Sequence, residues 1–244
     1  MSPRRTLATA GRVLTQIRHD PRTIGLMLVV PSLLIGLIAW IFVDTDVFDQ
    51  IGPAMLALFP FIIMFLVTSI TTLRERRTGT LERLLTLPIA KLDFILGYTI
   101  AFGLLAIAQA AIATAFAVWV CGLTIEGSIW LLFAVALADA VLGTTLGLLV
   151  SAFAATEFQV VQFMPAIVFP QVLLGGIIVP RAQMPDVLQA VSDWLPLSHA
   201  IDALNAVARD SEDAAYVGGK LLILGAFAFG AVVLGSITLR RRTP

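Results

Sequence analysis

The fold class of this chain is decided by the run IGLMLVVPSLLIGLIAWIFV, which extends from Ile24 to Val43. The run contains no charged side chain, and it ends before Asp44 without a small-residue cleavage site. At 1.5 Å per residue, a helix of about 20 residues matches the thickness of the hydrocarbon core of a bilayer. The run therefore predicts a retained membrane-spanning helix and argues against a cleaved signal peptide.

The rest of the sequence has the same character. Hydrophobic residues make up 59% of the chain and charged residues 13%, whereas soluble domains carry about 25% charged residues. Further apolar runs long enough to span a membrane occur at 54–73, 98–121, 129–153, 163–179 and 218–239. We therefore predict an all-α integral membrane protein with six transmembrane helices. The net charge of zero gives no indication of a nucleic-acid partner.

The fifth run differs from the others because it is short and contains Pro165 and Pro170, with Gln162 and Gln171 beside them. Proline removes a backbone hydrogen bond and bends a helix. We expect a kinked or re-entrant helix here, with the two glutamines facing a translocation path or packing against another helix.

Basic residues predict the orientation. They gather in three clusters, namely Arg4, Arg5, Arg12, Arg18 and Arg22; Arg74, Arg76, Arg77, Arg83 and Lys91; and Arg240, Arg241 and Arg242. With an even number of spans all three clusters fall on one side, and most of the loop acids fall on the other. By the positive-inside rule, both termini and the 74–97 loop are predicted to be cytoplasmic in a multi-pass protein of a bacterial plasma membrane.

Two amphipathic stretches flank the spans. Within residues 1–22, apolar side chains recur at helical spacing at Leu7, Ala10, Leu14 and Ile17, which favours an interfacial helix on lipid phosphates over a solvated basic tail. Residues 181–208 form two short segments separated by Pro196, and we expect this hairpin to rest on or dip into the outer leaflet. The chain is interpreted as one transmembrane domain, 1–244, with a six-helix part at 24–239 and a tail at 240–244.

Residues for catalysis are scarce. The sequence has no phosphate-binding loop of the G-x-x-x-x-G-K-[ST] type and no G-x-S-x-G motif. Cys121 is the only cysteine, and His19 and His199 are predicted on opposite sides of the membrane, each in a solvated or capping role. We therefore expect no metal site and no catalytic residue in this chain.

Asp139 is the one acid inside a predicted span. An aspartate at the centre of a span costs roughly 2.5–3.5 kcal/mol on insertion scales, so it normally faces protein or water. Asp139, Gly143, Gly147 and Ser151 recur every fourth residue and form a stripe of small and polar side chains that suits close helix packing. Two interpretations stay open, an interhelical hydrogen bond and a contact with substrate or a cation in the translocation path.

The loop after the second span reads RERRTGTLERLLTLP, from Arg74 to Pro88. Gly79 interrupts the preceding helix, Thr80 can cap a new one, and Pro88 ends it. A short amphipathic helix is predicted, with Leu81, Leu84 and Leu85 on one face and Glu82 and Arg83 off it.

This loop resembles the signature loop of the permease subunits of type-2 ABC exporters, and the later segment VPRAQMP (Val179 to Pro185) and the six-span topology add to the resemblance. The daunorubicin-exporter-like group is the most similar. The resemblance implies a chain that is not an enzyme and pairs with a second copy of itself and with two ATPase subunits, which hold ATP and Mg. It also implies a hydrophobic substrate such as a drug, an antibiotic or a lipid, and a path lined by the second and fifth helices.

The resemblance further implies roles for individual residues. The segment 79–88 would be the coupling helix that docks on the ATPase, with Ala154–Gln162 as a weaker contact. The coupling residues are Gly79, Thr80, Leu81, Glu82, Arg83, Leu84 and Pro88, and those of an extracellular gate are Pro180, Met184, Pro185 and Pro196. Two other classes remain as alternatives, an ion-coupled secondary carrier that uses Asp139 and a polytopic membrane enzyme.

Overall fold

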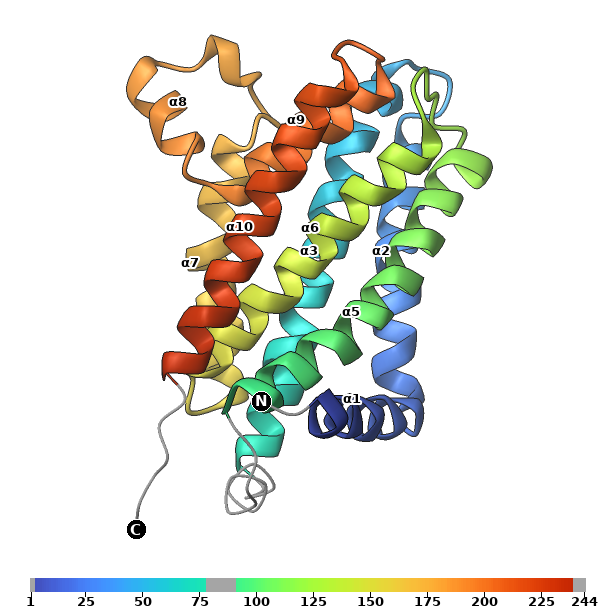
Figure 1. Cartoon of the computed structure of the whole chain (residues 1–244). Coiled ribbons are helices and arrows are strands. Elements are labelled where there is room, and N and C mark those ends of the chain that lie inside the picture. Colours follow the sequence, from blue (N-terminus) through green and yellow to red (C-terminus); the bar gives the residue numbers. More distant parts are fainter. Residues whose placement is uncertain (1–2, 78–90, 239–244) are drawn as a thin grey trace.

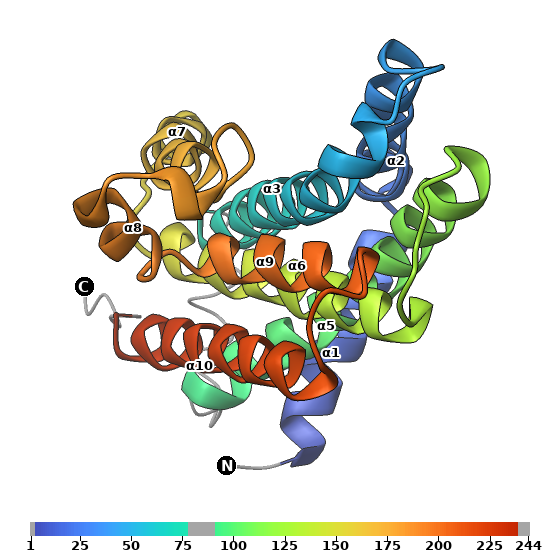
Figure 2. The ribbon, with the colours of Figure 1, turned by 90° about the horizontal axis from the view of Figure 1, so that it is seen from above.

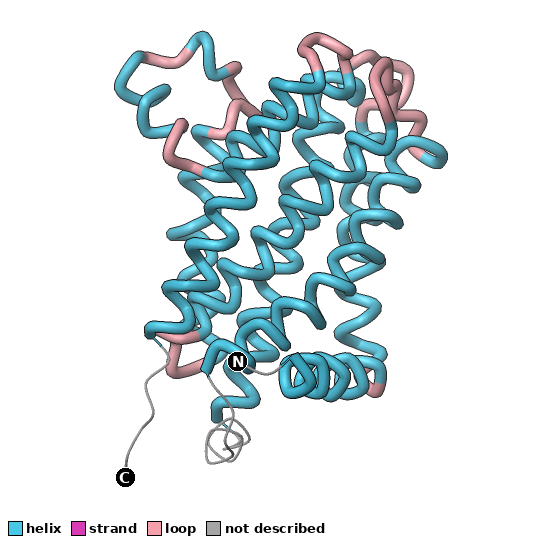
Figure 3. Tube along the Cα trace, in the orientation of Figure 1, coloured by secondary structure: helices cyan, strands magenta, loops and turns pink. Residues whose placement is uncertain are grey.

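The computed structural model describes residues 3–77 and 91–238, and these ranges form helices joined by loops, without a strand (Figure 3). Six of the described helices are long and apolar enough to cross a membrane, and they confirm the predicted all-α membrane fold. They are Pro21–Ile41 (α2), Val47–Arg77 (α3), Lys91–Ala115 (α5) with the π-helical turn Phe116–Val120 (η1), Ile129–Ser151 (α6), Glu157–Leu174 (α7) and Ala214–Thr238 (α10).

Two ends of the bundle can be distinguished (Figure 1). The helix Pro3–Arg18 (α1) lies across the end at which α10 finishes, and we call this the proximal end. The connections from α2 to α3, from η1 to α6 and to the start of α10 lie at the opposite, distal end. The six spans therefore bring α1 and the last described turn of α10 to the same end, as an even number of crossings requires.

The centre of the bundle is formed by α3 and α6. In their most apolar windows 67% and 61% of residues are buried, against 22% for α2, 17% for α7 and 22% for α10. Figure 2 shows α6 between α3 on one side and α10 on the other. The three outer spans therefore expose most of their apolar side chains to lipid or to another protein.

The α1 helix confirms the predicted amphipathic segment, and the alternative of a solvated tail is wrong. It packs against α5 and α2 and buries Thr6, Ala10, Val13 and Ile17. The buried face is rotated from the predicted stripe, as shown by Leu7, which is 61% exposed. The cause is the close approach of α5, where a Cβ on Gly97 would lie 2.7 Å from the Cβ of Thr9.

The fifth span, α7, begins and ends earlier than the predicted run 163–179. Thr156 caps it by accepting a hydrogen bond from the Gln159 amide, and Glu157 occupies the first turn, where a carboxylate suits the helix dipole. Gly175 and Gly176 end it, and Gly176 has a φ of +88°. The helix passes through both prolines and crosses the bundle, so it is not re-entrant.

The distal segment that follows contains a 3₁₀ turn, Arg181–Gln183 (η2), and two helices, Asp186–Ser192 (α8) and Pro196–Ala208 (α9). The side chains of Val187, Val191 and Trp194 in and after α8 are exposed, as expected for an interfacial helix. The same expectation is wrong for α9, which packs against α3, α6 and α10 and is almost wholly buried. Its alanines permit this close contact, since Ala200, Ala203 and Ala206 expose little or no surface.

Candidate functional site

The predicted coupling residues lie outside the described part of the chain. These are Gly79, Thr80, Leu81, Glu82, Arg83, Leu84 and Pro88. The described chain does show what flanks them: α3 ends at Arg77 and α5 begins at Lys91, both at the proximal end beside α1 (Figure 1). The surroundings of this segment are therefore defined by the last turn of α3, the first turns of α5 and the N-terminal helix.

Glu75, in the last turn of α3, lies at the centre of these surroundings. Its side chain is 4% exposed, and its carboxylate accepts hydrogen bonds from Arg12 of α1, at 2.9 Å from Nη2 and 3.4 Å from Nη1. The hydroxyl of Tyr98, on α5, donates to the same carboxylate. Arg12 Nη2 also lies 2.8 Å from the Tyr98 hydroxyl. One buried carboxylate thus joins three helices that are distant in the sequence.

The two residues beside Glu75 contact other helices. Arg74 forms a two-point ion pair with Glu157 at the start of α7, at 2.7 Å and 3.2 Å. Arg76 donates to the carbonyl oxygen of Ser151 at the end of α6. We call this set of contacts the proximal junction; its members are Arg12, Arg74, Glu75, Arg76, Tyr98, Ser151 and Glu157. The sequence pattern does not reveal these pairings, although Glu75 stands out as an acid among arginines.

A helix cap adjoins the proximal junction. The carboxylate of Asp20 accepts hydrogen bonds from the Thr23 hydroxyl at 2.6 Å and the Thr23 amide at 3.2 Å. These bonds, the side-chain bond foremost, lower the pKa of Asp20 below its ordinary value. The cap fixes the start of α2 directly after α1.

The predicted stripe of small residues on α6 lies against α3. A Cβ on Gly143 would lie 2.5 Å from the carbonyl oxygen of Phe61, and one on Gly147 would lie 2.5 Å from that of Phe65. Such distances leave no room for a side chain, so these glycines allow the two backbones to touch. Ser151 continues the contact, since its carbonyl accepts from Arg76.

Asp139 is fully buried on the same helix, one turn from Gly143. Neither of its carboxylate oxygens has a hydrogen-bond partner among the described residues. One of the two open interpretations, an interhelical hydrogen bond, therefore has no donor in the described part of the chain. The expectation that Asp139 faces protein is met.

The two glutamines of the fifth span have different surroundings. Gln171 is buried, its Nε2 donates to the Ile167 carbonyl at 2.9 Å, and its Oε1 accepts from the amide of Leu197 at 3.2 Å. It therefore packs α7 against the start of α9. Gln162 is exposed on a face that also presents Phe158 and Phe169. Gln162 therefore does not pack against another helix of this copy of the chain.

The predicted gate residues lie at helix starts in the distal segment. Pro180 precedes η2, Pro185 precedes α8 and Pro196 is the first residue of α9, where its fixed φ suits a helix start. Met184 is half-buried between η2 and α8. These residues are close in the chain, but the contacts that hold the segment come from other side chains.

A second group of charges, which we call the distal junction, holds this segment; it comprises Arg181, Asp193, His199, Asp202 and Lys220. Arg181 pairs with both Asp193 and Asp202. Lys220 Nζ, on α10, lies 2.8 Å from Asp202 Oδ2 and 3.3 Å from His199 Nδ1. His199 Nε2 lies 2.9 Å from the Asp193 carbonyl oxygen. The predicted solvated role of His199 is therefore wrong, because α9 carries it into the protein.

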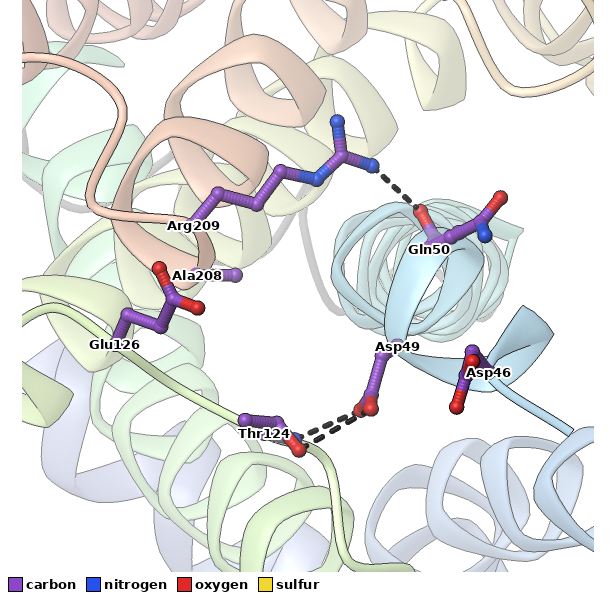
Figure 4. Close-up of a pocket in the computed structure, with 7 residues that line it drawn as sticks. All are labelled: Asp46, Asp49, Gln50, Thr124, Glu126, Ala208 and Arg209. Atoms are coloured by element: carbon purple, nitrogen blue, oxygen red, sulfur yellow. Dashed lines mark hydrogen bonds between the residues drawn. The ribbon is translucent and has the colours of Figure 1, made fainter. Parts of the chain in front are cut away.

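A pocket of about 210 Å³ opens on the distal surface (Figure 4). It is lined by Asp46, Asp49, Gln50, Thr124, Glu126, Ala208 and Arg209. Asp49 accepts from the amide of Thr124 at 2.8 Å and from its hydroxyl at 3.1 Å, and Arg209 donates to the Gln50 carbonyl at 3.3 Å. These bonds join the start of α3 to the loop after η1 and to the end of α9. No group of three metal-binding side chains occurs among the described residues.

Comparison with known proteins adds family information. The model of the family described as "ABC-2 type transporter" matches residues 4–208. The Escherichia coli protein "Probable multidrug ABC transporter permease YbhR" is 29% identical over 150 residues, covering 62% of this chain and 41% of that protein. The Dictyostelium discoideum protein "ABC transporter G family member 20" is 26% identical over 159 residues, covering 65% of this chain and 22% of that protein. The matched part of the chain thus spans less than half the length of these relatives.

Proposed function

Because the chain belongs to the ABC-2 type transporter family and is a permease subunit, we propose that it forms the translocation path of an exporter driven by a separate ATPase. In this proposal two copies of the chain assemble with two ATPase subunits, which bind ATP and Mg. The observation that supports it most is the match of the family over residues 4–208, which include the proximal junction and the segment between α3 and α5.

Coupling is assigned to the segment 79–88, with Glu82 as its docking carboxylate. The basic clusters support a cytoplasmic proximal end, where an ATPase could reach this segment. The connection between α6 and α7 is the second contact, since Arg74 joins it to the end of α3. Both termini are cytoplasmic in this proposal, and the protein resides in a bacterial plasma membrane.

The substrate class is inferred from the exposed face of α7. Beyond the first turn of α7 this face is apolar apart from Gln162, and it belongs to the least buried span. A hydrophobic or amphipathic cargo, such as a drug, an antibiotic or a lipid, suits a path of this composition between two copies of the chain. The distal segment, with Pro180, Met184, Pro185 and Pro196, is proposed as the outer gate.

The test is recovery of the ATPase with the tagged chain from native membranes. Glu82→Ala should reduce recovery while the melting temperature of the chain stays near the parental value, since truncating a desolvated interfacial carboxylate costs roughly 2–5 kcal/mol of binding. Glu212→Ala is the matched control, because Glu212 is exposed at the distal end. Full recovery with Glu82→Ala would remove Glu82 from the docking site, and absence of any ATPase with the parental chain would contradict the proposed function.

An ion-coupled carrier is the second candidate, and the unpartnered Asp139 is the observation that favours it. The two functions differ in what drives transport. Asp139→Asn should leave an ATP-driven exporter active, since asparagine keeps the size and shape of the side chain in a packed interface. Loss of dye efflux in a folded Asp139→Asn protein, together with efflux that persists in ATP-depleted vesicles under a proton gradient, would favour the carrier.

A further inference from the structure

Three consecutive residues at the end of α3 contact four other helices. Arg74 pairs with α7, Glu75 with α1 and α5, and Arg76 with the end of α6. Only Arg77 separates them from the first residue beyond the described part of α3. A displacement of the last turn of α3 therefore reaches these four helices at one point.

The three contacts differ in strength. The Arg74–Glu157 pair is open to solvent, with side chains 59% and 42% exposed, and exposed pairs contribute little because water screens them. Glu75 is 4% exposed and its carboxylate accepts from two side chains. Breaking a buried and hydrogen-bonded pair leaves a charge without compensation, which makes such a contact stiff. Of these two ion pairs, the one between Glu75 and Arg12 is therefore the stronger, since its side chains are 4% and 31% exposed.

The partners of Glu75 are themselves connected. Arg12 Nη2 binds both the carboxylate and the Tyr98 hydroxyl, and its guanidinium lies 5.8 Å from the centre of the Tyr98 ring. Tyr98 is fully buried and follows Gly97, the residue on which α1 packs. The end of α3, the start of α5 and the middle of α1 are thus joined by side chains and by direct packing, and they move together.

We propose that Glu75 is a positioning residue that transmits movement of the segment after α3 to α1 and α5, with Arg12 and Tyr98 as its receiving groups. This proposal rests on the proposed function, in which that segment docks on the ATPase. Glu75 itself does not dock. Its removal uncouples the ATPase from the distal end of the permease while the complex stays assembled.

The experiment uses the permease–ATPase complex in lipid nanodiscs, with Cys121→Ser and spin labels at the exposed distal positions Asp46 and Ala190. The measured quantity is the shift in label-to-label distance on adding Mg·ATP and vanadate. Glu75→Gln should reduce this shift at least threefold, while ATPase recovery and basal ATP hydrolysis stay within twofold of the parent. The exchange variant Arg12→Glu with Glu75→Arg should restore at least half of the shift.

Arg74→Gln is the control, because it removes the exposed pair at the same helix end and should change the shift less than twofold. Tyr98→Phe, which removes one hydroxyl, takes the place of Glu75→Gln if that variant does not fold. A parental shift in Glu75→Gln would overturn the proposal. Loss of ATPase from the Glu75→Gln complex would also overturn it, because Glu75 would then act in docking.

The isolated chain separates this proposal from the proposed function. A spin label at Gly11, an exposed position of α1 with open space around it, should become more mobile in Glu75→Gln. That measurement needs no ATPase. An immobile label at this position would refute the link between Glu75 and α1, whereas a parental chain that recovers no ATPase would refute the exporter and leave the link intact.

Discussion

The two polar junctions of this protein are built differently. The proximal junction joins residues far apart in the sequence, with 63 positions between Arg12 and Glu75 and 83 between Arg74 and Glu157. The distal junction joins residues 6 to 21 positions apart, between Arg181 and Lys220. The first connects whole helices to one another, and the second holds one segment against α9 and α10. The proximal end is therefore suited to transmitting movement, and the distal end to releasing a local segment.

The contact between α3 and α6 lies between the two junctions, and its loss should have the largest effect. Gly147→Val would place a side chain against the Phe65 carbonyl, which cannot move without moving α3. We expect a destabilisation of about 3 kcal/mol, at the upper end of the range for overpacked cores. The readouts are a lower melting temperature and a loss of monodispersity in detergent. Gly230→Val on α10, where there is open space, is the control. Equal melting temperatures for the two variants would contradict a tight α3–α6 contact.

The proximal end is tested next by moving α1. Gly97→Val would press on Thr9 and on the Thr6 carbonyl, and should weaken the packing of α1 on α5 by about 2 kcal/mol. A label at Gly11 should gain mobility, while the distal segment keeps its protease resistance. Gly103→Val, on the same helix with open space, should change neither. Loosening of both ends by Gly97→Val would erase the distinction between the junctions.

Asp202 tests the distal end. It accepts from both Arg181 and Lys220, so Asp202→Asn removes the charge on which two cations depend. The three side chains are 12–22% exposed, and we expect a loss of about 1.5 kcal/mol, as for a hydrogen bond to a charged group. Proteolysis within residues 175–195 should accelerate while the Gly11 label stays immobile. Asp186→Asn, at an exposed position of α8, is the control.

The smallest effect is expected at the Asp20 cap. Asp20→Ala should cost about 1 kcal/mol. Folding lowers the pKa of Asp20, so the contribution of the cap is complete above the ordinary carboxyl range and is lost as pH falls through the lowered folded value. The stability difference between the parent and Asp20→Ala should therefore shrink on acidification. A difference that grows instead would mean that the carboxylate does not act as the cap.

The sequence predicted the number of spans because hydropathy and length report on lipid exposure. It misplaced the fifth span because Glu157 and Gln159 are polar, although they occupy the first turn of α7. It also misjudged α9, whose amphipathic pattern does not distinguish a lipid surface from a protein interior. Rotation and contact partners depend on the neighbouring helix, and no local pattern contains that information.

For the candidate sites too, features set by the local sequence were predictable and features set by neighbouring helices were not. The Gly143 and Gly147 stripe was predictable, because small residues at fixed spacing have one main structural use. The pairing of Arg12 with Glu75 was not predictable. The distribution of charges along the sequence indicates on which side of the membrane a residue lies, but not which residue it pairs with. Asp139 could be placed inside the protein from its cost in lipid, whereas its lack of a donor depends on the residues around it.

The two prolines within α7 also affect how this surface can interact with other molecules. Proline has no amide hydrogen, so the carbonyl groups four residues earlier, at Val161 and Ala166, receive no helical hydrogen bond from Pro165 and Pro170. Both of these residues are exposed. Such carbonyl oxygens can accept a hydrogen bond from any donor group, whatever the structure of the molecule that carries it. If α7 lines the path of the proposed exporter, these acceptors among phenylalanines would bind amphipathic molecules of varied structure.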